Sequence, residues 1–477
     1  MKALIIAAGK GERLRRWDGD LPKPLFKVAG LTLIERAILS AKKAGITEFV
    51  IVTGYQGDTI QKRLSSKRQD KLGVTIQFVQ NDDWEKANGH SVLKAKPYLN
   101  NDFVLMMSDH IFDWRILEAL VRNGTVAGEV TLAVDGRVDE IFDLDDATKV
   151  KTLDGTPASL IAEIGKEIPS YDAIDTGLFL CSPTLFQALE NACTEGKGSL
   201  TEAMRLLAAE GKARTFRIGN HYWQDVDTQP SLKEAYRVLF RSLRKDTDGV
   251  ISRYFNRWVS GLMTRILIRT SLTANQVTWS ALVVGLLSGF FVSKGTPHDV
   301  AIGGLLFQFA SIYDGCDGEM SKLKLSSSKF GEWLDTVCDN ITYLAFFGGV
   351  ILGIYRQGYS NIMPMGLLTG FGVVMALATM YLYLVRFTNS GSLVTVQKDL
   401  SGDLETVEQN AFIALFGRVK FMVKRDFFAV LFMVLCLMNK LEWILILTAL
   451  GSNLAWIVIL TMKREFASEP KPELSRN

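Results

Sequence analysis

The composition of this 477-residue chain changes sharply near its middle. Up to about Leu243, apolar runs are short and interrupted by charges, as is usual in a soluble domain. Beyond Gln276, stretches such as 277–292 and 441–462 carry few or no charges and approach the length needed to cross a bilayer. The chain therefore divides into a soluble half and a membrane half.

The second half contains six apolar segments: 276–294, 300–313, 333–355, 362–385, 427–438 and 441–462. With the N-terminal half in the cytoplasm, the outer connections hold only three basic residues, Lys294, Arg356 and Lys440. The remaining lysines and arginines of the connections fall on the inner side, in agreement with the positive-inside rule. This predicts an all-α domain of six transmembrane helices in the inner or cell membrane, with the N-terminal domain and the C-terminus cytoplasmic.

The predicted regions are a cytosolic domain at 1–240, a juxtamembrane linker at 241–275, a transmembrane domain at 276–465 and a cytosolic tail at 466–477. Within the linker, four arginines alternate with apolar residues: Arg253, Arg257, Arg265 and Arg269. This pattern predicts an amphipathic helix lying on an anionic leaflet. An ordinary solvated linker helix is the alternative.

Charge and cysteine usage exclude several classes of function. The net charge of +3 is small and the basic residues form no single tract, so nucleic acid is not an expected partner. The five cysteines form no CxxC pair and the four histidines are scattered, so neither a disulfide framework nor a zinc site is indicated.

In the first half, strand-like runs alternate with helical stretches such as 33–44. The runs lie at 3–8, 48–52, 75–79, 103–107 and 130–134. Such alternation predicts a Rossmann-like α/β domain with a mostly parallel sheet and helices on both faces. Ligands of such sheets bind beyond the carboxyl ends of the strands, where the glycine-rich loop after the first run and Asp109 are expected to lie.

The first of these runs leads into a glycine-rich loop. Gly9 and Gly11 can expose backbone amides to phosphate oxygens, and Arg13 adds a forked donor. The dinucleotide pattern GxGxxG is not satisfied, because Leu14 stands at its third glycine. The GxGxR pattern followed by PKPL at residues 22–25 resembles the sugar-phosphate nucleotidyltransferases, over roughly the first 240 residues.

That resemblance implies catalytic and binding roles for particular residues. Lys23 would bind the acceptor phosphate, Asp109 would hold magnesium, and Asp225 would be the second metal carboxylate, with Asp227 as the second choice. Residues resembling the base, ribose and acceptor sites of the cytidylyltransferase branch are Asn88, Gly89, Ser91, Lys166 and Thr176. A degenerate, non-catalytic copy of the domain is the alternative.

The membrane half carries two pairs of aspartates at helical spacing. Asp314 and Asp317 are three residues apart and Asp335 and Asp339 are four apart, so each pair occupies one face of a helix. Carboxylates at membrane depth are costly and need partners, which indicates a cation site or an ion pathway. Oxygen ligands favour magnesium or calcium. The alternative is that these aspartates only cap helices or lie solvated in loops.

The pattern DxxDG followed by GxxxDxxxD resembles the CDP-alcohol phosphotransferases, over roughly residues 248–462. In that family the first three aspartates carry metal and the last is also the general base, which would be Asp339. Gly318 and Lys322 lie at the motif's substrate-binding positions. Ser321-Lys322 replaces the usual Ala-Arg, so the bidentate phosphate contact of arginine is lost.

The fusion of the two domains resembles bifunctional inositol-1-phosphate cytidylyltransferases and di-myo-inositol phosphate phosphate synthases. It implies that CTP and inositol 1-phosphate give CDP-inositol, after which a second inositol 1-phosphate displaces CMP. Mg²⁺ is the expected cofactor, with Mn²⁺ as a substitute, and Arg425 would hold the acceptor phosphate. Membrane lipids and a second copy in a homodimer are the other expected partners. The alternatives are a phospholipid-making enzyme and a nucleotide-gated, ion-coupled transporter.

Overall fold

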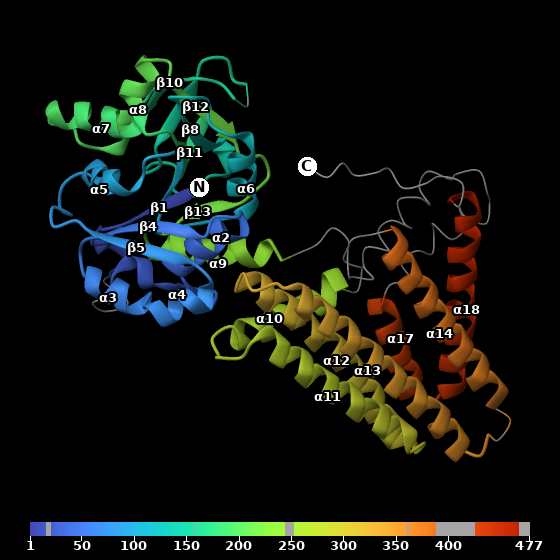
Figure 1. The fold of residues 1–477 in the computed structure, drawn as a ribbon. Helices are drawn as coiled ribbons and strands as arrows, with labels where there is room; N and C mark the ends of the chain where they lie inside the picture. Colours follow the sequence, from blue (N-terminus) through green and yellow to red (C-terminus); the bar gives the residue numbers. More distant parts are fainter. Residues whose placement is uncertain are drawn as a thin grey trace. The chain divides into compact units, whose positions relative to one another are not determined.

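The computed structural model describes residues 1–15, 21–156, 158–243, 252–359, 361, 363–387 and 425–466. The chain forms two compact units, Met1–Ser242 and Leu243–Asn477 (Figure 1). The predicted boundaries of the linker and tail stay predictions. All of the predicted tail after Phe466, and part of the predicted linker, lie outside the described residues.

The first unit is built on a mixed sheet. Its parallel part has the order β5-β4-β1-β6. These strands are β1 (Lys2–Ala7), β4 (Glu48–Thr53), β5 (Thr75–Gln80) and β6 (Phe103–Met107). Each coincides with a predicted apolar run, so the α/β prediction is confirmed in this part of the sheet.

Beyond β6 the sheet continues through a long antiparallel strand, β11 (Ala173–Cys181). Strand β11 also pairs antiparallel with β8 (Val130–Asp135) and β9 (Lys149–Thr152). The remaining strands of the sheet are β10 (Ile161–Gly165), beside β9, and β12 (Ala213–Arg217), beside β8. The strands β5, β4, β1 and β6 are thus all parallel to one another, and the glycine-rich loop follows β1 in this part of the sheet.

Helices cover both faces of this sheet, because alternate strand residues enter two different cores. Leu4 of β1 packs into one core, and its neighbours Ala3 and Ile5 pack into the other. Helices α7 (Thr184–Thr194) and α8 (Leu200–Ala209) contribute to the first core. Helices α2 (Leu33–Lys43) and α6 (Trp114–Asn123) contribute to the second. The strand ends between the two layers remain available for a site.

The described part of the second unit is helical. Its helices are α10 (Arg257–Leu267), α11 (Ala274–Ser293), α12 (Pro297–Leu323), α13 (Lys329–Arg356), α14 (Met363–Phe387), α17 (Arg425–Leu437) and α18 (Leu441–Phe466). Three helices within the described residues are long and apolar enough to cross a membrane: Ala274–Ser293, Lys329–Arg356 and Pro364–Leu382. Shorter apolar helices lie at Asp426–Leu437 and Leu441–Ile457. The count of six spans and their orientation stay predictions.

Helix α12 is longer than its apolar segment. The apolar segment found in the sequence ends at Tyr313, whereas the helix continues to Leu323 and carries Asp314 and Asp317, as their helical spacing predicted. Hydropathy marks only the apolar part of a helix, and polar side chains that find partners allow the helix to continue. The acids are therefore held on regular helix rather than in a loop.

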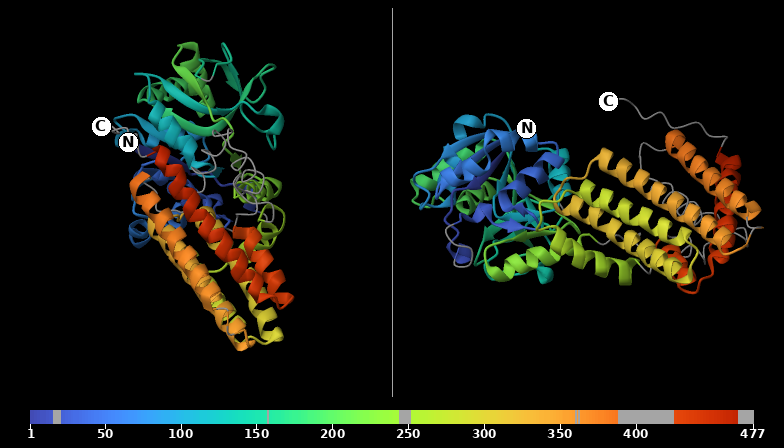
Figure 2. Two further views of the ribbon diagram at one scale, coloured as in Figure 1. Left: turned by 90° about the vertical axis from the view of Figure 1, so that its right-hand side faces the viewer. Right: turned by 90° about the horizontal axis from the view of Figure 1, so that it is seen from below.

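Helices α11, α12 and α13 run side by side, as Figure 2 shows in two further views. Glycines allow α11 and α13 to approach closely. A Cβ atom at Gly349 would lie 2.2 Å from the carbonyl oxygen of Gly289, and one at Gly289 would lie 2.4 Å from that of Ala345. Gly348, next to this contact, has no atom within 4 Å of the corresponding position. Small residues at these points set the spacing of the two helices.

We predict that Gly349→Ala separates α11 from α13 and destabilises the second unit by about 1–3 kcal/mol, the usual cost of overpacking. The matched change Gly348→Ala adds a methyl group to open space and is expected to be neutral or stabilising, because alanine favours helix. Thermal unfolding of the detergent-solubilised protein measures both. Equal melting temperatures for the two variants would contradict the proposed contact.

Candidate active sites of the two units

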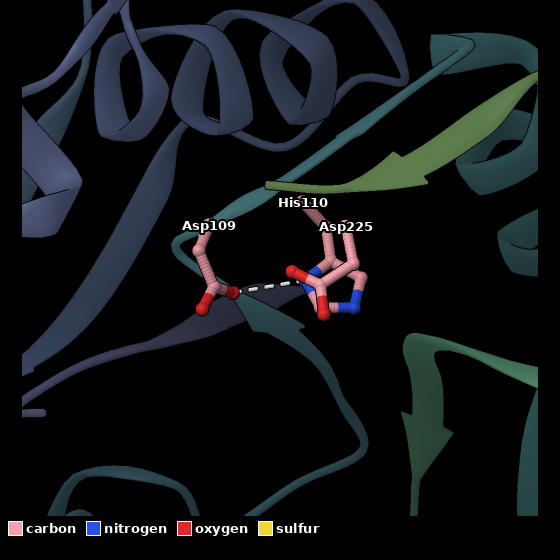
Figure 3. Close-up of side chains that lie close together, drawn as sticks. All are labelled: Asp109, His110 and Asp225. Atoms are coloured by element: carbon pink, nitrogen blue, oxygen red, sulfur yellow. Dashed lines mark hydrogen bonds and ion pairs between the residues drawn. The ribbon is translucent and has the colours of Figure 1, made fainter. Parts of the chain in front are cut away.

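In the first unit, a short two-stranded sheet brings distant acids together. Strand β7 (His110–Phe112) pairs with β13 (Trp223–Asp225), and the register places Asp225 opposite His110. The amide of Val226 donates to the carbonyl oxygen of Asp109 at 3.1 Å. Asp109, His110 and Asp225 therefore converge, as Figure 3 shows. Each offers one ligand atom, and these atoms lie within 4.8 Å of one another.

Lys23 reaches into this cluster from the start of a short 3-10 helix, η1 (Lys23–Leu25). Its ammonium is buried and donates to Asp109 at 2.5 Å, forms an ion pair with Asp227, and lies 3.9 Å from a carboxylate oxygen of Asp225. Gly11 allows this approach: it has a φ of 62°, and a Cβ there would lie 2.6 Å from Cβ of Lys23. The predicted pairing of the glycine-rich loop with the PKPL motif therefore has a steric basis.

Burial and charge act in opposite directions on the titrating groups of this cluster. Burial alone would raise the pKa of Asp109, but the Lys23 ammonium and His110 outweigh it and hold that pKa well below its usual range. Burial raises the pKa of Asp225. For His110, burial would lower the pKa, but the carboxylates of Asp225 and Asp109 raise it. Asp109 is therefore the carboxylate held most firmly in its charged form.

The donor set of this cluster fits a divalent cation. One oxygen of Asp225 is buried and, among the described residues, has no hydrogen-bond partner. Such an oxygen is a suitable ligand for a cation that carboxylates prefer, such as Mg²⁺ or Mn²⁺. Asp227 differs, because its carboxylate forms ion pairs with Lys23 and Arg13. The geometry thus supports Asp225 as the ligand of the divalent cation. Asp227 instead holds the side chains of Lys23 and Arg13.

A residue that the sequence did not indicate connects two of the predicted binding residues. The carboxylate of Asp146 accepts from both Arg13 and Lys166, which are distant in sequence. Asp146 lies among several acids in a loop, and no sequence pattern distinguishes it from its neighbours. Arg13 and Lys166 thus lie on one side of the site, where they can contact an anionic substrate.

The softer nucleotide-site predictions fall on residues that have internal partners. Oδ1 of Asn88 accepts from the amide of Leu200 at 2.9 Å, and the buried hydroxyl of Ser91 accepts from Asn81 at 3.0 Å. The hydroxyl of Thr176 donates to the carbonyl of Ala133 at 2.7 Å. Side-chain binding by these residues would compete with those bonds, so their substrate-binding role stays a prediction.

Two of the three predicted binding-site glycines of this unit, Gly9 and Gly89, differ in their surroundings. At Gly89, a Cβ would lie 2.4 Å from the carbonyl oxygen of Gly198, so this glycine allows two chain segments to meet. Gly9, in contrast, is exposed, and a Cβ there would have no atom within 4 Å. Gly9 therefore leaves its loop open to a ligand.

In the second unit, three of the four predicted acids converge. Asp314 of α12 meets Asp335 and Asp339 of α13, and their ligand oxygens lie within 4.8 Å of one another. The fourth, Asp317, is buried and accepts a hydrogen bond from the hydroxyl of Thr278 on α11. An all-oxygen set of this kind fits Mg²⁺ or Mn²⁺. The sequence identified all four acids but not the helix that each one faces.

A small pocket opens beside these acids between α11, α12 and α13. Its lining combines Asp314 and Asp339 with polar and apolar side chains: Thr278, Thr342, Cys338, Ala281, Leu282 and Ala310. Gly318 is exposed and leaves open space beside the motif, and Lys322 is exposed near the end of α12. Arg425 begins α17, but its side chain lies outside what the structure describes.

The comparisons with known proteins assign a class to each unit. Residues 2–241 match the family described as nucleotidyl transferase, and residues 271–461 match the family described as CDP-alcohol phosphatidyltransferase. The chain is therefore an enzyme with two transferase domains. The apolar helices and the second family match are together typical of a membrane-associated unit.

The chain is also similar to curated relatives over most of its length. It is 32% identical to the bifunctional IPC transferase and DIPP synthase of Archaeoglobus fulgidus, covering 82% of this chain and 73% of that one. It is 33% identical to the protein of the same name from Aquifex aeolicus, covering 78% and 82%. The chain belongs to this family of bifunctional IPC transferases and DIPP synthases.

Among solved structures, the inositol-1-phosphate CTP transferase from T. maritima is similar to this chain. It is 27% identical, covers 50% of this chain and 94% of its own, and has a TM-score of 0.43. Because that score is low, the family relationship depends on the sequence comparisons.

We predict that Asp225→Asn and Asp227→Asn affect cation binding differently. Loss of the Asp225 ligand should weaken Mn²⁺ binding to the first unit on the order of tenfold or more. Asp227→Asn should change it much less, because Asp227 pairs with Lys23 and Arg13. Titration of Mn²⁺ followed by electron paramagnetic resonance measures this, in full-length protein with Asp314 and Asp339 changed to asparagine. Equal weakening by both variants would count against this assignment.

Proposed function

We propose that this chain catalyses two consecutive reactions. The first unit joins CTP and inositol 1-phosphate into CDP-inositol and releases pyrophosphate. The second unit transfers the inositol-phosphoryl group to a second inositol 1-phosphate and releases CMP. The observation that carries this proposal is the presence of two separate acid clusters, one in each transferase domain. The two curated relatives, both named bifunctional IPC transferase and DIPP synthase, support this pair of reactions.

In the first reaction, a phosphate oxygen of inositol 1-phosphate attacks the α-phosphorus of CTP and pyrophosphate leaves. Lys23 holds the acceptor phosphate, exchanging its contacts with Asp109 and Asp227 for phosphate oxygens. Arg13 and the amides at Gly9 and Gly11 bind the triphosphate. A divalent cation held by Asp109 and Asp225 would neutralise charge on the triphosphate. Lys166, joined to Arg13 through Asp146, lies where it can contact the acceptor.

In the second reaction, a hydroxyl oxygen of the second inositol 1-phosphate attacks the phosphorus that bears inositol, and CMP leaves. Asp339 accepts the hydroxyl proton as general base. Lys322 and Arg425 provide positive charge for the substrate phosphates. A divalent cation held by Asp314, Asp335 and Asp339 would stabilise the charge of the departing CMP. We propose Mg²⁺ for both clusters, with Mn²⁺ able to replace it, because both donor sets contain mainly carboxylate oxygens.

We further propose that the second unit spans the inner or cell membrane several times and keeps the first unit in the cytoplasm. CTP and inositol phosphates are charged and cannot cross lipid, so both clusters need access to the same compartment. The concentration of basic residues in the predicted inner connections supports this orientation.

We predict that each of two variants of the purified full-length protein loses one of the two reactions and keeps the other. Asp339→Asn should lower CMP release by at least about 100-fold, the lower end of the range for loss of a general base, and leave pyrophosphate release unchanged. Lys23→Met should lower pyrophosphate release and leave CMP release unchanged when CDP-inositol is supplied to the second unit directly. Labelled CTP and inositol 1-phosphate with Mg²⁺ allow both products to be measured.

Three outcomes would overturn parts of this proposal. Full CMP release by Asp339→Asn would remove Asp339 as the base. CMP release that requires a diacylglycerol-containing alcohol would make the second unit a phospholipid enzyme. Equal use of other polyol phosphates would overturn the choice of inositol.

A further inference from the structure

Besides the four aspartates described above, the second unit contains a further acid, Glu319, which is buried. Glu319 of α12 is only 3% exposed and follows Asp317 by two residues. A carboxylate buried to this degree is costly unless several donors satisfy it. Its partners therefore indicate why the chain places an acid there.

All three donors to Glu319 come from α10. Its carboxylate accepts from the guanidinium of Arg257 at 3.0 Å and from the hydroxyls of Ser260 and Thr264 at 2.7 Å each. The spacing of these donors, three and four residues apart, puts them on one face of α10. The thiol of Cys316 adds a contact of 3.6 Å to the carbonyl of Ser260. One carboxylate thus accepts from three side chains on one face of α10.

The polar face of α10 is turned inward and its apolar face outward. Trp258, Leu262 and Ile266 are exposed on the side opposite to the donors. Arg257 was predicted to face an anionic leaflet, but the structure pairs it with Glu319 instead. Glu319 is therefore the main polar anchor of α10 within the described residues that contact it.

Glu319 lies on the far side of α12 from the acid cluster. At 3.6 residues per turn, it is rotated by roughly 140° from Asp314 and 160° from Asp317. The contact between Asp317 and Thr278 holds one side of this helical turn, and the contact between Glu319 and α10 holds the other. The two contacts restrain the rotation of α12 about its axis from opposite sides, and this rotation decides where Asp314 points.

Little else restrains this turn at its two glycines. A Cβ at Gly318 would meet no atom within 4 Å, and one at Gly315 would meet only Cβ of Ser260, at 3.9 Å. These glycines add no side-chain packing of their own, so the polar contacts orient the turn together with the buried side chains of Cys316 and Met320. A change on the Glu319 side should therefore reach the acids on the other side.

We propose that Glu319 is a positioning residue for the phosphoryl-transfer site, acting by fixing α10 against the turn that carries Asp314 and Asp317. This inference rests on the proposed function of the second unit. It requires that the charge of Glu319 and the pairing with Arg257 matter for how the acids bind a cation, beyond their contribution to folding.

The test uses Glu319→Gln in the full-length protein. The amide keeps an acceptor oxygen but loses the charge that pairs with Arg257. We expect CMP release from CDP-inositol and inositol 1-phosphate to fall on the order of tenfold and the Mg²⁺ concentration for half-maximal release to rise, as for loss of an outer-shell contact. Pyrophosphate release by the first unit should be unchanged, and the melting transition of the full-length protein reports whether the second unit is folded. Glu442→Gln, the same change at a half-exposed acid of α18, is the matched control.

A second measurement separates positioning from structure. Mn²⁺ titration by electron paramagnetic resonance, with Asp109 and Asp225 changed to asparagine, should show weaker binding to the second unit in Glu319→Gln. The double variant Arg257→Gln with Glu319→Gln, which removes both charges of the pair, should recover both CMP release and Mn²⁺ binding to within about threefold of wild type, since the coupled pair is then neutral.

The outcomes distinguish this inference from the proposed function. Unchanged CMP release and unchanged Mn²⁺ binding in Glu319→Gln would overturn the inference, as would a double variant that recovers neither. Loss of the melting transition together with pyrophosphate release would show a role in folding only and would also overturn it. A wild-type protein that releases no CMP would instead contradict the proposed function itself.

Discussion

The second unit depends on holding like-charged carboxylates close together. Asp314, Asp335 and Asp339 offer oxygens within 4.8 Å of one another, on α12 and on α13, which is long and apolar enough to cross a membrane. Such charges repel strongly there, and a divalent cation turns the repulsion into attraction. The helices must nevertheless hold the acids in place before the cation binds. Close packing at Gly289 and Gly349 supplies that rigid frame.

The first unit meets the same problem with a cation of its own. The Lys23 ammonium lies among Asp109, Asp225 and Asp227, so the negative charge of this cluster is partly neutralised within the protein. The two units thus balance acids in different surroundings, one at the end of a sheet and one between helices. In the first unit Gly11 permits the approach of Lys23, and in the second Gly289 and Gly349 permit the approach of α11 and α13.

Much of the fold could be predicted because it follows local rules. Apolar runs of strand length became β1, β4, β5 and β6, and the apolar segments of the second half became helices. Helical spacing correctly paired the acids of α12 and of α13. Asp146 and Glu319 could not be predicted, because each is one acid among many, and only its partners distinguish it. The length of α12 was also missed, since its last turns are polar.

The sequence by itself determined strands β1, β4, β5, β6 and β8, the apolar helices of the second unit and which acids share a helix face, because these depend on local apolar runs and on periodicities along the chain. Only the tertiary structure decided which acid faces which partner. The β7–β13 pairing sets Asp225 beside Asp109 and leaves Asp227 to Lys23. Helix packing turns Asp317 to Thr278 and Arg257 to Glu319. These choices depend on contacts between residues far apart in the sequence, which no local pattern specifies.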